Sequence, residues 1–432
     1  MKFKTLLLSI SAAWLVSAEQ HSTAPPPPPA TQPFRGGAVK TRAPRRGGGT
    51  FPSLGQADSL AQFNADVTTV LKDLRGNKND PTMKRMFHSR LRPTFAVTWT
   101  HKMWEQNSSR WRFVVQFVFW YQSALLKRVL PQLTALLGWT AMVLYFFETN
   151  KEWPLSNIKF PMTSLSLVSG FVASLLALRT NQGMSRLLEG RMAFGKVVLY
   201  TRDMASMVSN FIYDKDPQLA LKLARHLATF SWLLKNFLRG TKASGGKDED
   251  LIRTMLPTPA DADYILRQRK MPVAVVMRLR QALAHCTHKH LLSTAEEIAI
   301  DHTISAMDLA IMTTERIIAS PIPPLFTTHA GRLMCFYLLF LPLALYGSGS
   351  MNKVGLFLTV GIVGYAMLGL DELSHMMEQP FKVSPLFHLC KNSMNDVADA
   401  FCLRPPALDA RGNAPYVPAV EPTYHSDEEG FE

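Results

Sequence analysis

The stretch PMTSLSLVSGFVASLLALRTNQGMSRLLEGRMAFG, residues 161–195, joins an apolar segment to a charged one without interruption. Residues 162–178 carry no charge, and Gly170 is the one helix-weakening position among them. Charged residues then follow with no proline between them, namely Arg179, Arg186, Glu189 and Arg191. This pattern predicts a helix that crosses a membrane and continues into water as a charged rod.

The apolar half of this helix has two unlike faces at helical spacing. Small side chains form one face: Ser166, Gly170, Ala173, Ser174 and Ala177. Large apolar side chains form the adjoining face: Leu167, Phe171, Leu175 and Leu178. Small residues allow membrane helices to pack closely, and they also suit a helix that lines a narrow pathway. The residues alone leave both interpretations open.

The distribution of apolar residues indicates an all-α membrane protein. Of 432 residues, 47% are hydrophobic and 19% are charged. The apolar residues gather into four runs, at about 129–147, 162–178, 333–346 and 354–370. A polar section separates the second run from the third, and strand patterns are essentially missing. We therefore predict four apolar helices, with long helices extending into a soluble region.

The last two runs predict a helical hairpin around the flexible loop GSGSMNK, residues 347–353. Each run falls slightly short of the roughly 20 residues that cross a bilayer alone, so burial against other helices is expected. In the polar section, helices are predicted at about 194–213, 217–239, 271–292 and 293–318. Asp216 caps the second of these, and Ser293 with Glu296 opens the last at capping-box spacing. Residues 240–250 predict a turn-rich loop.

Residues 1–50 have the composition of a targeting leader and are set apart from the fold. Lys2 and Lys4 precede an apolar stretch at 6–16, as in a secretory signal peptide. A basic segment rich in Pro, Gly and Ala follows, like an organelle transit peptide. Such two-part leaders are typical of proteins that enter plastids acquired by secondary endosymbiosis. The alternative is a secreted or surface protein with a disordered basic arm.

The chain is divided accordingly into 1–50, a polar segment 51–98 containing a short surface helix, a main domain 99–403, and a disordered acidic tail 404–432. At the start of the main domain, aromatic and basic residues mix in a way that suits a membrane interface. The net charge of +14 comes partly from the leader, and no nucleic-acid motif is present, so a nucleic-acid partner is not expected.

No cofactor or metal is expected. The four cysteines have no CxxC spacing, which argues against a zinc site or a disulfide framework. His285, His288 and His290 form a single cluster, whereas a di-iron centre needs several such clusters on facing helices. We interpret them as solvated residues at a helix end.

Three stretches resemble the signatures of bestrophin-like anion channels, in particular the plant and algal plastid branch with its thylakoid voltage-dependent chloride channels. They are LALRTNQGMSRLLEGRMAFG at 176–195, TERIIASPIPPLFTTHAGRLMCFYLLFLPLAL at 314–345 and LGLDELSHMMEQPF at 368–381. The resemblance runs from about Trp99 to Phe401, with the four apolar runs in the expected order. It implies a homopentamer, surrounded by membrane lipids, that passes chloride or bicarbonate across a plastid membrane, most simply the thylakoid.

The resemblance also implies a central pore lined by the second apolar helix. Counting back from Arg186 puts the neck at Gly170, Ser174 and Leu178, or at Phe171 if the helix is rotated. These small residues depart from the large apolar side chains usual in the family. The calcium clasp of animal relatives has no convincing equivalent, because Asp371 and Glu372 form at most a part of one.

Arg179, Thr180 and Asn181 are the candidate anion-attracting residues, one turn beyond the apolar run. A pathway for anions needs donors and positive potential without tight binding, and a charge at that depth should face water or a partner. The alternative for Arg179 is that it reaches out to lipid headgroups.

Two other functions remain open besides a channel. An anion carrier usually shows inverted repeats, and none relates the two apolar pairs. A membrane scaffold, whose soluble helices would bind a partner, has no need of Arg179 at its depth.

Overall fold

A computed structural model of the chain describes residues 59–76, 101–118, 120–149, 161–240, 247–349 and 351–404. The predicted leader 1–50 and nearly all of the acidic tail lie outside the described residues. Within them the chain is helical and contains no strand, so the prediction of an all-α fold is confirmed.

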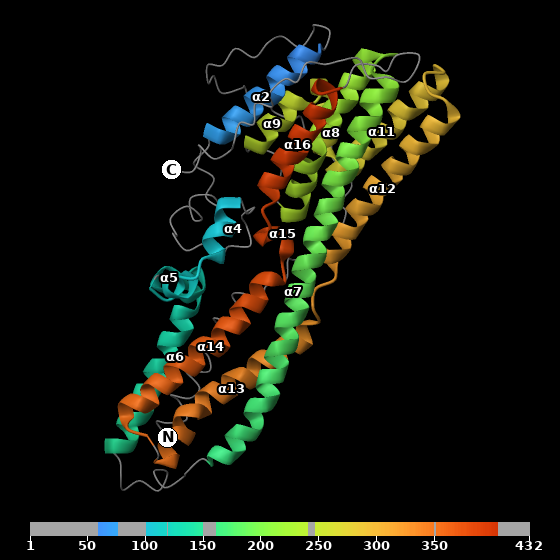
Figure 1. The fold of residues 1–432 in the computed structure, drawn as a ribbon. Helices are drawn as coiled ribbons and strands as arrows, with labels where there is room; N and C mark the ends of the chain where they lie inside the picture. Colours follow the sequence, from blue (N-terminus) through green and yellow to red (C-terminus); the bar gives the residue numbers. More distant parts are fainter. Residues whose placement is uncertain are drawn as a thin grey trace, which may run out of the picture. The chain divides into compact units, whose positions relative to one another are not determined.

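The longest element is α7 (Met162–Met207), a single helix of 46 residues that continues into the π-helical turn η3 (Val208–Ile212). At 1.5 Å per residue, a helix of this length measures roughly 70 Å. Figure 1 shows α7 running beside both groups of helices, the apolar group at one end and the soluble group at the other. The predicted continuous rod is therefore present.

Three more apolar helices pack against the first part of α7: α6 (Ala124–Thr149), α13 (Pro324–Ser348) and α14 (Lys353–Met377). These four helices are long and apolar enough to span a membrane, which confirms the prediction of four apolar helices. The last two are 25 residues each, longer than their apolar runs, because polar flanking residues continue each helix. Val129, Val172 and Val360 are among the buried residues of their shared core.

The soluble helices surround α8 (Pro217–Arg239), which is buried along most of its length. Around it lie α9 (Lys247–Met255), α10 (Pro259–Arg267), α11 (Met271–His288), α12 (Thr294–Ala319), α15 (Pro380–Val383) and α16 (Leu386–Cys402). The Asp216 side chain accepts a hydrogen bond from the Leu219 N–H, as predicted. The capping box of Ser293 and Glu296 is also present.

Two boundaries in this region differ from the prediction. The loop predicted at 240–250 is partly helical, because α9 begins at Lys247 and its acidic first turn suits the positive end of a helix dipole. Helix α11 ends at His288 instead of continuing to residue 292, and His290 adopts a positive φ of 52° in the turn that follows. Side-chain periodicity does not detect such a turn, because apolar residues continue through it.

The predicted short helix is present as α2 (Leu60–Gly76), and its apolar face packs against the soluble core while its other side is exposed. Phe63, Val67 and Val70 are buried, and the Phe63 ring meets that of Phe401 edge-on, with ring centroids 6.2 Å apart. Asp66 forms a 2.7 Å ion pair with the buried Arg225. Residues 60–76 therefore contribute an integral part of the soluble helical region, although their mixed composition hides this.

Candidate functional site

Helix α7 packs against its neighbours along one face that carries Arg179, Gly183, Arg186 and Gly190. Their spacing of four, three and four residues keeps them on the same side of a helix. An ideal Cβ atom on Gly183 would lie 3.1 Å from the Ser374 carbonyl oxygen, and one on Gly190 would lie 2.7 Å from the Pro380 Cβ. At Gly190 a side chain would force the start of α15 away, and at Gly183 the end of α14 would have to give by a few tenths of an ångström, so both glycines favour this close approach.

Arg186 joins three segments by donating to backbone carbonyls. Its Nε donates to the Glu378 oxygen at 3.2 Å, and its Nη2 donates to the Ile317 oxygen at 2.6 Å. A further hydrogen bond reaches the Ser320 oxygen. These carbonyls lie at the carboxyl ends of α12 and α14, where backbone oxygens lack helical partners and carry partial negative charge. Arg186 therefore links α7 to two helix ends at once.

Arg179 is buried, with 6% of its surface exposed, and it pairs with two carboxylates of α14 and its cap. It contacts Asp371, and its Nη2 lies 3.4 Å from Glu378 Oε1. Its charge is thus balanced within the chain. We therefore revise its predicted role: Arg179 holds α7 against α14, and does not present open positive charge to a pathway. Burial without compensation would be costly at this depth, which explains why the acidic residues lie opposite it.

More polar contacts surround this cluster. Arg128 of α6 lies 2.9 Å from Glu372, and His375 Nδ1 lies 3.5 Å from Glu378. Burial opposes ionisation of Glu378, but the bond from His375 and the charge of Arg179 outweigh it, so the pKa of Glu378 is below its ordinary value. Among the described residues, no group of three or more His, Cys, Asp or Glu side chains that could hold a metal ion occurs.

The opposite face of α7 is exposed from the apolar half into the soluble half. Phe171 and Leu178 are 72% and 53% exposed, and Ser174 lies between them on the same face. Gly170 is exposed at the edge of this stripe, and nothing in the chain lies within 4 Å of the position of a Cβ there. The predicted neck residues and the alternative Phe171 thus share one open face.

Thr180 and Asn181, the other predicted anion-attracting residues, have different surroundings. The Thr180 hydroxyl donates to the Leu176 carbonyl oxygen at 2.8 Å and is partly buried. Asn181 is exposed and lies on the open face, one turn beyond Leu178. Of the three residues, Asn181 is therefore the one that can present donors to an ion beside this helix.

Lys196 was not among the predicted site residues, but it lies 18 residues, or five helical turns, beyond Leu178 and therefore on the same face. Its side chain is exposed. The five-turn spacing was visible in the sequence, but nothing there shows which face of α7 stays open.

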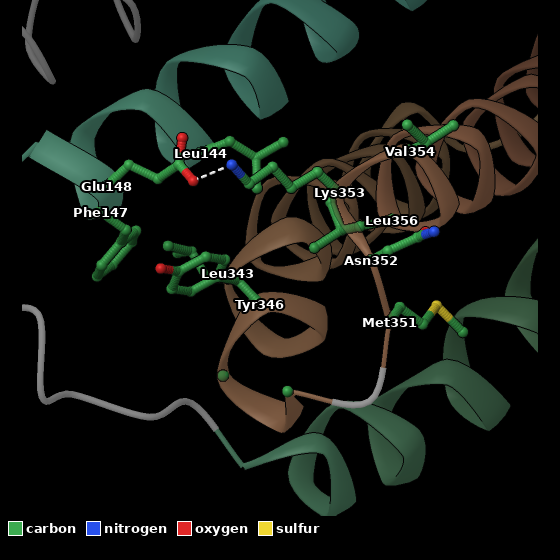
Figure 2. A pocket seen from close by; sticks show the side chains of 12 residues that line it. Leu144, Phe147, Glu148, Leu343, Tyr346, Met351, Asn352, Lys353, Val354 and Leu356 are labelled. Carbon is green, nitrogen blue, oxygen red and sulfur yellow. Dashed lines mark ion pairs between the residues drawn. The ribbon is translucent and has the colours of Figure 1, made fainter.

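A cavity of about 730 Å³ lies elsewhere, among the ends of α6, α13 and α14 (Figure 2). Glu148 and Lys353 form an ion pair at its rim, and the rings of Phe147 and Tyr346 stack with centroids 5.1 Å apart. No residue of the α7 face lines it. We interpret this cavity as a gap where helix ends diverge, separate from the candidate site.

Comparisons with known proteins give the family. The family model described as Bacterial/Fungal Bestrophin protein matches residues 103–399. The chain belongs to the bestrophin family. It is 25% identical over 296 residues to the voltage-dependent anion channel-forming protein alr2987 of Nostoc, covering 65% of this chain and 88% of that one. It is 23% identical over 314 residues to the chloroplastic voltage-dependent chloride channel 1 of Arabidopsis thaliana, covering 70% and 72% of the two chains.

The fold of this bestrophin also resembles a crystal structure of a bacterial bestrophin homologue from Klebsiella pneumoniae. The TM-score is 0.57 at 19% identity, and the match covers 63% of this chain and 98% of that one. The prediction of a bestrophin-like arrangement of four apolar helices is confirmed. Helix α2 lies outside the residues that the family model matches.

The close approach at Gly190 can be tested with a pair of alanine substitutions in α7. We expect Gly190→Ala to destabilise the protein by about 1–3 kcal/mol, because the added methyl group would overlap the Pro380 ring. Gly195→Ala is the matched control, since nothing lies within 4 Å of that position, and it should stabilise the helix by about 0.5–1 kcal/mol. Thermal unfolding of the purified protein in detergent measures both. Equal effects of the two changes would contradict the proposed contact.

The structural role of Arg179 predicts a second pair of results. Arg179→Met keeps the approximate length of the side chain but leaves Asp371 and Glu378 without their basic partner. It should therefore lower the free energy of unfolding by about 3 kcal/mol. Arg316→Met removes the exposed pair with Glu189 and should cost less than about 1 kcal/mol. The measurement is the midpoint temperature of thermal unfolding in detergent. If the midpoint of Arg179→Met is no lower than that of the control, then the pairs made by Arg179 do not hold α7 in place.

Proposed function

We propose that this bestrophin is an anion channel and not an enzyme, formed by a homopentamer whose copies of α7 line a central pore. The observation that carries this proposal is the open face of α7, which runs from the apolar half into the soluble half while the opposite face is held by α13, α14 and α12. A single copy encloses no pathway along this face, so several copies are required to form one.

The composition of the open face favours a pore over contact with lipid. A helix side that faces lipid is expected to be apolar throughout its membrane depth. Here the polar Ser174 lies between the apolar Phe171 and Leu178 on this face, and the polar Asn181 lies one turn beyond Leu178. Alternating small polar and large apolar residues suit a constriction that is narrow but can still hold water.

The selectivity for anions is supported by Asn181, by Lys196 and by the names of the relatives. Five symmetry-related copies would place a ring of Lys196 ammonium groups in the wide aqueous part of the pathway. Such a ring raises the local concentration of anions without binding them tightly. The relatives in Nostoc and Arabidopsis are named as anion and chloride channels. We propose chloride or bicarbonate as the ion carried.

Within the neck, we propose that Phe171 and Leu178 form the narrowest part, with Ser174 keeping the space between them hydrated. Phe171 has the larger exposed side chain, whereas Gly170 offers no side chain to the pore. We therefore propose the neck in which the helix is rotated to bring Phe171 to the pore, and not the neck formed by Gly170, Ser174 and Leu178.

A plastid membrane, most simply the thylakoid, is the proposed location. The composition of residues 1–50 and the chloroplastic relatives of Arabidopsis support it. Helix α2 sets a limit on processing, because cleavage beyond Leu60 would remove core residues such as Phe63. The mature chain should therefore begin between about residue 50 and Ser59. Terminal sequencing that finds Met1 in the mature protein would contradict this location.

The channel proposal is tested by recording from purified protein in a planar bilayer. Single-channel steps with an anion-selective reversal potential are expected. Slow saturable flux without steps would indicate a carrier, and the absence of both would indicate a scaffold.

Substitutions in the neck test which residue forms the constriction. We expect Phe171→Ala to raise single-channel conductance, because it removes the largest exposed side chain of the membrane half of α7. Ser174→Phe should lower conductance or close the channel by drying the neck, and Ser174→Ala should change little. If Phe171→Ala has no effect while Ser174→Phe blocks the current, then the constriction lies at Ser174. The neck would then be formed by Gly170, Ser174 and Leu178.

Charge reversal at Lys196 tests the source of anion selectivity. Lys196→Glu should lower the preference for anions over cations, and Lys196→Gln should have an intermediate effect, because each removes positive potential from the pathway. The control is Lys222→Glu, which makes the same change at an exposed position of α8. The reversal potential in a salt gradient is the measurement. An identical reversal potential for Lys196→Glu and Lys222→Glu would remove Lys196 from the pathway.

A further inference from the structure

Three short elements precede the first membrane helix and leave an apolar face uncovered. They are α4 (His101–Ser108), α5 (Arg112–Val118) and the 3₁₀ turn η1 (Trp120–Gln122). Figure 1 shows α4 and α5 at the end of α6 that lies nearer the soluble helices. Helix α5 packs against α4 and η1.

The side chains of α5 show which surface is left open. Phe113, Val114, Phe117 and Val118 share one face, and all four are exposed, Phe117 to 81%. The neighbouring Trp111 is exposed to 70%. Because apolar surface of this kind is rarely left in water, the face requires an occupant.

Contacts with α14 set the depth of this segment relative to the membrane helices. The Trp120 Nε1–H donates to the Tyr365 hydroxyl at 2.9 Å, and the two rings meet edge-on with centroids 5.2 Å apart. Just beyond it, Arg128 pairs with Glu372 near the end of α14. Tyr365 lies seven residues, or about two helical turns, before Glu372 on α14. The segment therefore lies within two turns of the level where α14 changes from apolar to charged residues, which is where a bilayer surface would be.

The charges of the segment favour an anionic surface. Residues 101–128 contain five Lys and Arg residues and a single Glu. Arg110 and Arg112 are exposed beside the apolar face, and Trp111 lies between them. Aromatic rings and basic side chains together are the combination found at membrane interfaces, and each basic residue near an anionic leaflet adds attraction.

We propose that residues 110–118, together with Trp120 and Tyr121, lie in the headgroup layer of the membrane and bind anionic lipid headgroups through Arg110 and Arg112. The apolar face of α5 would then insert at the boundary of the acyl chains, as amphipathic interfacial helices do. This inference rests on the membrane location that the proposed function assumes, but it does not depend on ion conduction.

A second copy of the chain fits this face less well. Among the described side chains of α5, four form the apolar face, whereas a stable protein interface uses about 20–30 residues on each side. The flanking arginines would also be brought toward the partner, although charged residues are depleted at the centre of interfaces. Continuity with α6, which enters the membrane directly after η1, places the lipid surface next to this face.

The test uses the full chain reconstituted in vesicles that contain brominated lipids, which quench tryptophan fluorescence on contact. The fluorescence of Trp111 is obtained as the difference between the tryptophan fluorescence of the native protein and that of Trp111→Phe. We expect Trp111 to be quenched, and more strongly by brominated phosphatidylglycerol than by brominated phosphatidylcholine. An unquenched Trp111 would mean that protein, such as a second copy, covers the segment, and it would overturn the proposal.

The double change Arg110→Gln with Arg112→Gln tests the selectivity for anionic lipid. It should lower the apparent preference for phosphatidylglycerol by roughly tenfold, because two attractive charges are lost. Arg267→Gln with Arg269→Gln is the matched control, since it removes the same charge from exposed positions in the soluble region. Equal effects of the two double variants would reject a headgroup site at Arg110 and Arg112. Because quenching needs no current, a protein that is quenched but does not conduct would contradict the proposed function and leave this inference standing.

Discussion

The structure depends on the contact between one face of α7 and the end of α14. Gly183 and Gly190 allow the backbones to approach, and Arg179 and Arg186 then reach partly buried carboxylates and carbonyls. Each part requires the other, because Arg179 could not be buried without those carboxylates. A membrane core lacks the hydrophobic driving force that packs soluble helices, so small residues and polar contacts must hold such a junction.

The opposite face of α7 is open because the neighbouring helices all pack against the face that carries Arg179, Gly183, Arg186 and Gly190. In the membrane half, α13 and α14 hold the helix, and in the soluble half α12 and α16 do so. One uninterrupted helix of 46 residues therefore carries the same open side from the apolar region to the soluble region. The exposed side chains of Phe171 and Lys196 therefore lie on the same side of one continuous helix.

Helix α2 shows how the soluble end is completed by a segment outside the matched family region. Its Asp66 balances the buried Arg225, while Phe63 fills a space beside Phe401. The same physical rule operates here as at Arg179: a buried arginine is found with a carboxylate from a distant part of the chain. Local composition does not reveal such pairs, because the partners are separated by more than a hundred residues.

The sequence by itself determined the helical class, the four apolar helices, the continuous rod of α7 and the caps at Asp216 and Ser293, because these depend on composition and on periodicity over a few turns. It also predicted which stretch of α7 would line a pore, and that remains a proposal. Only the tertiary structure decided which face of that helix is open and that Arg179 is paired with Asp371. The sequence shows that Lys196 lies five turns beyond Leu178 on one side of the helix, but only the structure shows that this side is exposed. Helical periodicity gives the angle between two side chains around the helix axis. Which side of α7 packs against another helix depends on contacts with α14, more than 150 residues away in the sequence.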